Sequence, residues 1–112
     1  MIAIVEEAYK LENGASLGYE ATLTGKILAI NTPYDAGYKN VTVTIAIPGI
    51  EDKPIMCYRL KGEGAEALKV GDSITVTGIL KNYKGTIEFD AGCTLVNVVK
   101  GENTFELPSE PS

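Results

Sequence analysis

The feature that most constrains the fold is a two-residue alternation of apolar and polar side chains that recurs along the chain. In the clearest instance, over residues 41–47, valine and isoleucine alternate with threonine and alanine, and Pro48-Gly49 follows directly. Alternation of this kind is typical of a β-strand with one buried face, and proline and glycine end such a strand. The pattern therefore predicts a domain built from short strands.

Four further segments have strand character, namely residues 20–30, 55–61, 74–80 and 87–99, and Gly92 is a point where the last could break. The stretches Asn31 to Gly37 and Asn82 to Gly85 are predicted loops. Gly25 and Gly78 interrupt strands, as the sharp bends of a barrel require. Five short strands without alternating helices predict an all-β fold, either a closed barrel or a sandwich.

Two segments favour helical structure. Apolar residues over 2–11 follow the spacing of one helical face, and Asn13-Gly14 is a stop signal. Residues 64–72 predict a helical turn followed by a tight turn between the third and fourth strands. We therefore expect an N-terminal helix and lead-in (1–15), a barrel (16–100) and a C-terminal extension (101–112). The Pro- and Ser-containing end is typical of a linker, which favours one domain of a longer protein, and the alternative is a small protein with frayed ends.

Composition restricts the function. The chain of 112 residues suits one domain, and it has no run of about 18 apolar residues that would insert in a membrane. It contains no His, the commonest general base, so we expect neither an enzyme nor a cofactor. Glu88 and Asp90 are expected to be solvated charges on the outer face of a strand. The net charge of −5 lowers the expectation of strong nucleic-acid binding.

The two cysteines, Cys57 and Cys93, are too few for a zinc-ligand set, so no metal is expected. Two interpretations of them remain open. They are either buried free thiols or a single disulfide, and a disulfide would indicate an oxidising compartment.

Several motifs resemble those of oligonucleotide/oligosaccharide-binding (OB) domains. Residues 60–78 contain Leu68-Lys69-Val70-Gly71-Asp72 between a strand and a strand that ends in Thr77-Gly78. Thr24-Gly25-Lys26-Ile27 resembles the first OB strand, and Tyr83-Lys84-Gly85 resembles the last hairpin. The resemblance spans residues 20–99. It implies a five-stranded Greek-key OB barrel with a helical turn between strands three and four.

The chain also resembles OB-type repeats of secreted or surface multidomain proteins of Gram-positive bacteria. This second resemblance implies a non-catalytic module outside the cell, with other domains of a parent protein as partners. It would also favour an oxidised pair of cysteines. We expect a monomer.

OB domains bind ligands on the outer face of strands two and three and on the flanking loops. Mapped onto this chain, the candidate ligand-binding residues are Tyr34, Tyr38, Lys39, Asn40, Thr42, Thr44, Arg59, Lys61, Asn82, Tyr83 and Lys84. Aromatic rings among cations suit stacked bases with phosphates, and they also suit sugars. Tyrosines can equally pack at barrel ends with wet hydroxyls.

The leading hypothesis is a non-catalytic binding module for a glycan or a protein partner. The alternatives are a domain that binds single-stranded nucleic acid and a purely structural spacer.

Overall fold

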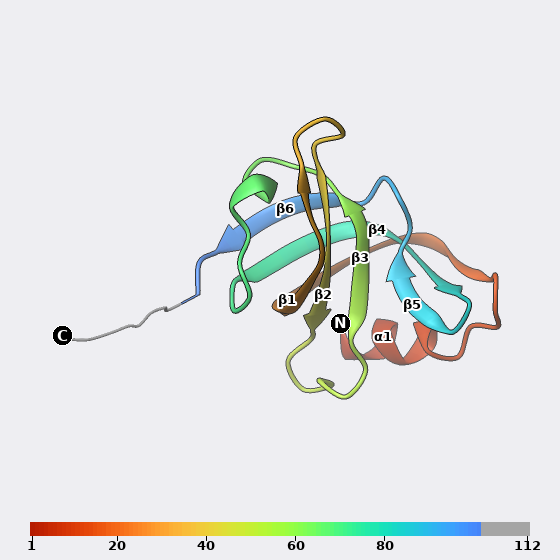
Figure 1. Cartoon of the computed structure of the whole chain (residues 1–112). Coiled ribbons are helices and arrows are strands. Elements are labelled where there is room, and N and C mark those ends of the chain that lie inside the picture. The colour runs from red at the N-terminus through yellow and green to blue at the C-terminus, as the bar shows by residue number, and fades with distance from the viewer. Residues whose placement is uncertain (102–112) are drawn as a thin grey trace.

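The computed structural model describes residues 1–101 (Figure 1). The strands are β1 (Ser16–Asp35), β2 (Asn40–Ala46), β3 (Ile55–Leu60), β4 (Ser73–Tyr83), β5 (Thr86–Phe89) and β6 (Thr94–Val99). One α-helix, α1 (Ile2–Ala8), precedes them, and a 3-10 helix, η1 (Ala65–Ala67), lies between β3 and β4. The prediction of an all-β domain is confirmed. The predicted C-terminal extension lies outside the described residues, apart from Gly101.

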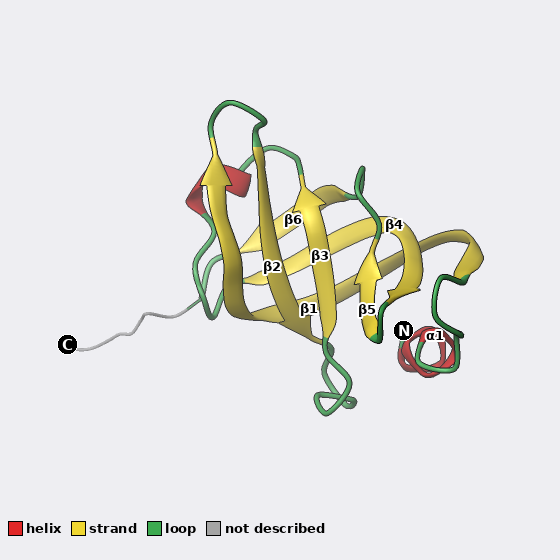
Figure 2. Cartoon of the chain, turned by 45° about the vertical axis from the view of Figure 1, so that its right-hand side comes forward, coloured by secondary structure: helices red, strands yellow, loops and turns green. Residues whose placement is uncertain are grey.

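The strands form one sheet in the order β1-β2-β3-β5-β4-β6, and a further pairing of β1 with β4 closes it into a ring (Figure 2). β3 and β5 run parallel, and all other pairs are antiparallel. The long β1 serves both sides of the ring, because its first half pairs with β4 and its second half with β2. The ring places β2, β3, β5 and β4 on one continuous outer face.

Gly25 lies where β1 passes from one partner to the other. Gly25 pairs with Ile74 of β4, and the next residue, Lys26, pairs with both β4 and β2. A Cβ atom at Gly25 would lie 2.7 Å from the carbonyl oxygen of Ala46. Only glycine allows β1 and β2 to approach so closely at this point, as the predicted bend requires.

Several element boundaries differ from the prediction, and β1 begins at Ser16 rather than at residue 20. The segment 31–37, expected to be a loop, continues β1 as far as Asp35. Here β1 pairs only with β2, and an edge strand tolerates the missing N–H of Pro33. β4 likewise extends through Tyr83, since Asn82 and Tyr83 pair with β5. The helix α1 ends at Ala8 rather than at residue 11.

The last predicted strand, 87–99, is divided into β5 and β6. The chain turns between them, where the N–H of Cys93 donates to the carbonyl of Asp90 at 3.2 Å and Gly92 has φ of +98°. This conformation favours glycine. The break suggested at Gly92 is therefore present, and it gives six strands in place of five.

The hydrophobic core fills the ring. Its largest fully buried side chains include Phe89, Leu23, Ile27, Ile45 and Leu80. α1 lies at the end of the ring opposite the β1–β2 hairpin loop and contributes buried Val5 and Ala8 (Figure 1). Within residues 1–101, no helix is long and apolar enough to cross a membrane.

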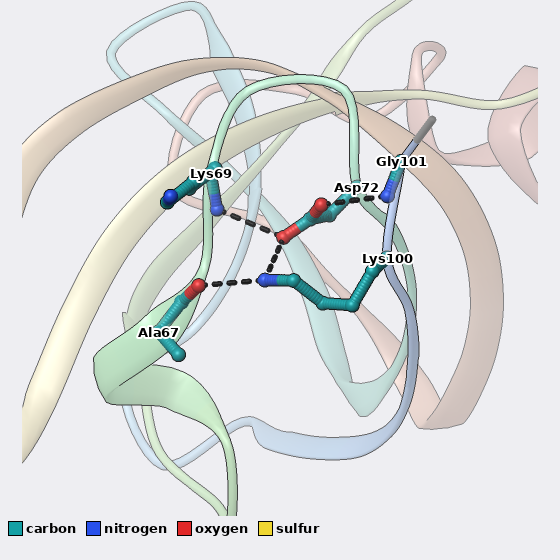
Figure 3. Close-up of polar contacts among 5 residues, drawn as sticks. All are labelled: Ala67, Lys69, Asp72, Lys100 and Gly101. Atoms are coloured by element: carbon teal, nitrogen blue, oxygen red, sulfur yellow. Dashed lines mark hydrogen bonds and ion pairs between the residues drawn. The ribbon is translucent and has the colours of Figure 1, made fainter. Parts of the chain in front are cut away.

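The buried carboxylate of Asp72 links the residues that follow β6 to the turn before β4 (Figure 3). Asp72 is fully buried, and its oxygens accept hydrogen bonds from the backbone N–H of Lys69 (2.9 Å) and of Gly101 (2.8 Å). The Lys100 ammonium donates to Asp72 at 2.6 Å and to the carbonyl of Ala67 at 2.7 Å. Burial alone would raise the pKa of Asp72, but these hydrogen bonds hold it below its ordinary value.

Candidate ligand-binding groove

Two adjoining pockets lie on the outer face formed by the end of β1 and by β2, β3, β5 and β4, and both are lined by Tyr58. The first, of about 390 Å³, is lined by Thr32, Asp35, Tyr38, Asn40, Thr42, Tyr58 and Arg59. The second, of about 370 Å³, is lined by Met56, Tyr58, Lys81, Tyr83, Thr86 and Glu88. We call the two pockets together the groove. Each volume falls in the range of about 300–1,000 Å³ found for small-ligand sites.

A β-bulge in β3 shapes the centre of the groove. Val41 pairs with Leu60 and Val43 with Cys57, so Tyr58 and Arg59 together lie opposite the single residue Thr42. Arg59 has φ of +52°, an uncommon value for a residue other than glycine. Bulges redirect side chains, and this one exposes Arg59 while Cys57, two residues earlier, stays buried.

The first pocket combines an aromatic ring with a cation. The Arg59 guanidinium lies over the Tyr58 ring, 5.0 Å from its centroid. The Asp35 carboxylate accepts hydrogen bonds from the backbone N–H of Gly37 (2.7 Å) and of Tyr38 (3.0 Å), and so holds the hairpin loop. Tyr38 projects from this loop and is 74% exposed. The pocket therefore offers Tyr38, Tyr58 and Arg59 to a ligand.

The second pocket also pairs an aromatic ring, Tyr83, with a cation, Lys81, and Lys84 lies beside the same ring outside the pocket lining. The ammonium groups of Lys81 and Lys84 lie 5.4 Å and 5.3 Å from the centroid of the Tyr83 ring. Lys81 forms an ion pair with Asp90 at 2.8 Å. This contact raises the pKa of Lys81 and lowers that of Asp90.

Glu88 is a buried carboxylate in the second pocket, only 5% exposed. Burial raises its pKa, while the Lys81 ammonium opposes this rise and the Asp90 carboxylate adds to it. The expectation that Glu88 is a solvated charge was wrong. The residue lies between Met56 of β3 and Lys81 of β4, and these paired neighbours cover it.

Neither the protein-family models nor the curated proteins include one that matches the chain. The groove must therefore be interpreted from its own chemistry.

The structure brings five of the predicted binding residues into the groove. Tyr38, Asn40, Thr42 and Arg59 line the first pocket, and Tyr83 lines the second. Thr42 is 6% exposed, and its hydroxyl accepts a hydrogen bond from the Arg59 N–H, so its role there is to hold the backbone.

The other predicted residues do not line either pocket: Tyr34, Lys39, Thr44, Lys61, Asn82 and Lys84. Tyr34 packs against the core, and the Thr44 hydroxyl donates to the Asn31 side chain at 2.8 Å. Asn82 donates to the carbonyl of Leu11 at 2.9 Å and accepts from the N–H of Gly85 at 2.8 Å, which stabilises the β4–β5 turn.

Sequence reasoning missed seven residues that line the groove: Thr32, Asp35, Met56, Tyr58, Lys81, Thr86 and Glu88. A usable signal existed for Met56 and Tyr58, because they flank Cys57, and a buried Cys57 places both on the outer face. No such signal marked Thr32 and Asp35, which lay in a predicted loop.

Cys57 and Cys93 are buried free thiols in the structure, so the disulfide that the sequence left open is not formed there. Burial raises the pKa of Cys57 well above its ordinary value and raises that of Cys93 to about 12. The Cys93 thiol lies 3.4 Å from the carbonyl oxygen of Tyr58, to which it can donate. Both cysteines act as small apolar groups beneath the groove.

Proposed function

We propose that the chain is a non-catalytic OB-type binding module and that the groove binds an oligosaccharide. The strand order supports the OB assignment. A ring of β1-β2-β3-β5-β4, with β3 parallel to β5 and a helical turn between β3 and β4, matches a Greek-key OB barrel whose last strand is divided into β5 and β6. The groove occupies the face on which OB domains bind ligands.

The observation that carries the choice of ligand is the charge balance of the groove. Its cations, Arg59 and Lys81, are matched by its carboxylates, Asp35 and Glu88. Lys81 is moreover paired with Asp90. A phosphate backbone requires an excess of positive charge, which these residues do not supply. A neutral sugar needs no such excess, and its apolar face can lie against an aromatic ring while its hydroxyls bind polar groups.

Single-stranded nucleic acid is the second candidate. Arg59 lies over Tyr58, while Lys81 and Lys84 flank Tyr83. Bases could stack on these rings, with a contribution of about 1–3 kcal/mol each. The two candidates differ in salt dependence, because phosphate contacts weaken steeply as salt rises and sugar contacts do not.

An amide chemical-shift titration of the 15N-labelled 112-residue protein tests the proposal. Cellohexaose, chitohexaose, mannohexaose and oligo-dT are added in turn at low salt. We expect a hexasaccharide to shift the amides of Tyr58, Arg59 and Tyr83, with an affinity that 200 mM NaCl leaves unchanged. If oligo-dT alone shifts these amides, and the shifts disappear when salt is added, the groove binds single-stranded nucleic acid instead.

A matched pair of tyrosine variants locates the site. Tyr58→Ala removes the ring shared by the two pockets and should weaken sugar binding at least tenfold. Tyr19→Ala removes a 44% exposed tyrosine of β1 that lines neither pocket, and it should bind normally. Equal loss in both variants would show that binding lies outside the groove.

A further inference from the structure

The Glu88 carboxylate is buried without a partner. The residue is 5% exposed and lines the second pocket of the groove, yet within residues 1–101 its side chain makes no hydrogen bond or ion pair with another protein group. Lys81 stands directly opposite Glu88 on β4, but its ammonium is paired with Asp90. Buried polar groups are almost always hydrogen-bonded, because an unpartnered one is costly. The fold tolerates this cost at a position that opens into the groove.

The contrast with Asp72 shows that the chain satisfies a buried carboxylate where structure alone requires it. Asp72 accepts two backbone N–H groups and one ammonium. Glu88 is paired with Lys81 of β4, but the Lys81 ammonium forms its ion pair with Asp90 instead. The acceptor capacity of Glu88 therefore remains available to a ligand.

We propose that Glu88 is the specificity-determining acceptor of the second pocket and that its two oxygens bind two neighbouring hydroxyls of one sugar unit. This inference rests on the proposed function of the groove. An ionised carboxylate only accepts hydrogen bonds, and it has two oxygens, so it matches a pair of adjacent donors. A vicinal diol presents such a pair, and Tyr83 supplies a ring for the apolar face of the same sugar.

Other ligand chemistries fit the pocket less well. A cationic ligand would be repelled by the ammonium groups of Lys81 and Lys84, which lie near the Tyr83 ring. A phosphate would meet the carboxylates of Glu88 and Asp90. The base guanine also presents adjacent N–H donors, although the phosphates of a guanine nucleotide would meet the same carboxylates. A guanine-containing oligonucleotide is therefore the rival ligand that the experiment must exclude.

The test compares Glu88→Gln with Glu20→Gln. Glu88→Gln keeps the shape of the side chain but replaces one acceptor oxygen with a donor. Glu20 is an exposed residue of β1 that lines neither pocket, so Glu20→Gln is the matched control. Titration calorimetry uses cellohexaose, chitohexaose and mannohexaose with the whole chain. We expect Glu88→Gln to weaken binding of the sugar that binds wild type by about tenfold to a hundredfold, since hydrogen bonds to charged groups are the stronger ones. Glu20→Gln should stay within twofold.

Thermal unfolding of the free proteins provides a readout that a structural role would not give. Removing an unpartnered buried charge should raise the Tm of Glu88→Gln by a few degrees while binding falls, as is common when a residue serves function at the expense of stability. A lower Tm would show that the carboxylate stabilises the fold, and it would overturn the inference.

The remaining outcomes separate the inference from the proposed function. If a sugar shifts Tyr58 and Tyr83 but binds wild type and Glu88→Gln equally, the function stands and the role of Glu88 is wrong. If none of the three sugars binds wild type, both fail. Binding confined to guanine-containing oligonucleotides, and lost in Glu88→Gln, would also overturn the inference, because Glu88 would then recognise a base.

Discussion

The backbone N–H of Arg59 in β3 donates a hydrogen bond of 3.1 Å to the hydroxyl of Thr42 in β2, at the bulge in the pairing of these two strands. This contact satisfies an N–H that the regular ladder leaves unpaired at a bulge. It also holds Arg59 at its positive φ, from which the guanidinium reaches the Tyr58 ring. The Thr42 hydroxyl thus positions Arg59 and Tyr58 at the centre of the groove.

Thr42→Val should therefore affect both stability and binding. Valine keeps the shape and removes the acceptor, which leaves a partly buried N–H unsatisfied at a cost of about 1–3 kcal/mol in the free energy of unfolding. Urea denaturation measures this loss, and a sugar titration should show weaker binding as the bulge relaxes. Thr44→Val is the control, because the Thr44 hydroxyl bonds to the exposed side chain of Asn31. Equal stability of the two variants would contradict a special role for Thr42.

Asp72 should make stability depend on acid pH. Its folded-state pKa is lowered from the ordinary value of 3.8, so its contribution is complete above that value and is lost as pH falls through the lower, folded-state pKa. Asp72→Asn should cost about 1–3 kcal/mol at pH 7, since the Lys100 ammonium and two backbone donors lose a charged acceptor. Denaturant midpoints from pH 7 to pH 2 should show the two proteins converging below pH 3.8.

Asp52→Asn is the matched control for this experiment. Asp52 also pairs with a lysine, Lys53, at 3.4 Å, but its side chain is 77% exposed, and exposed pairs contribute little. A difference between wild type and Asp72→Asn that persisted unchanged at pH 2 would rule out the ionised carboxylate as its source.

The alternating pattern predicted the fold class because a strand with one buried face imposes it directly. Residues 41–47 illustrate this, since Val41, Val43, Ile45 and Ile47 are all buried in the structure, although Thr42 and Ala46 of the alternate set are buried as well. A special role for Gly25 was also predictable, because a glycine inside a strand signals a bulge or a sharp bend. The boundaries at Asp35 and Tyr83 were not, since pairing with a distant strand overrode the local preference of Pro, Asn and Gly for loops.

The groove was only partly predictable, because its centre depends on one extra residue in β3. Strict alternation places Cys57, Arg59 and Lys61 on the same face, yet the bulge buries the first and exposes the other two. Nothing local in the sequence marks that insertion. Glu88 escaped prediction for a similar reason, since its burial comes from neighbours on β3 and β4 that are distant in sequence.

Cys57 and Cys93 should be unreactive in the native protein. Their raised pKa values, about 12 for Cys93, leave almost no thiolate at pH 8, and the thiolate is the reactive form. We expect 5,5′-dithiobis(2-nitrobenzoic acid) to label neither thiol in the folded protein and both in guanidinium chloride. Rapid labelling without denaturant would contradict this burial. Two unreactive cysteines in denaturant would instead reveal a disulfide in the purified protein.

Gly25→Ala should be strongly destabilising, and Gly18→Ala should not, although both residues lie in β1. A Cβ at Gly25 would lie 2.7 Å from the Ala46 carbonyl oxygen and 2.9 Å from the Ile47 side chain. The backbone of β1 or β2 would therefore have to move where β1 passes from β4 to β2. Overpacking of this kind costs about 1–3 kcal/mol. A Cβ at Gly18 meets nothing within 4 Å, and alanine there should leave the urea midpoint unchanged or slightly higher. Because the closure of the ring depends on this crossing, the loss in Gly25→Ala should be accompanied by faster amide exchange in β2, which a purely local clash would not produce. Equal urea midpoints for the two variants would show that the crossing has room to adjust, and glycine at position 25 would then not be needed to close the ring.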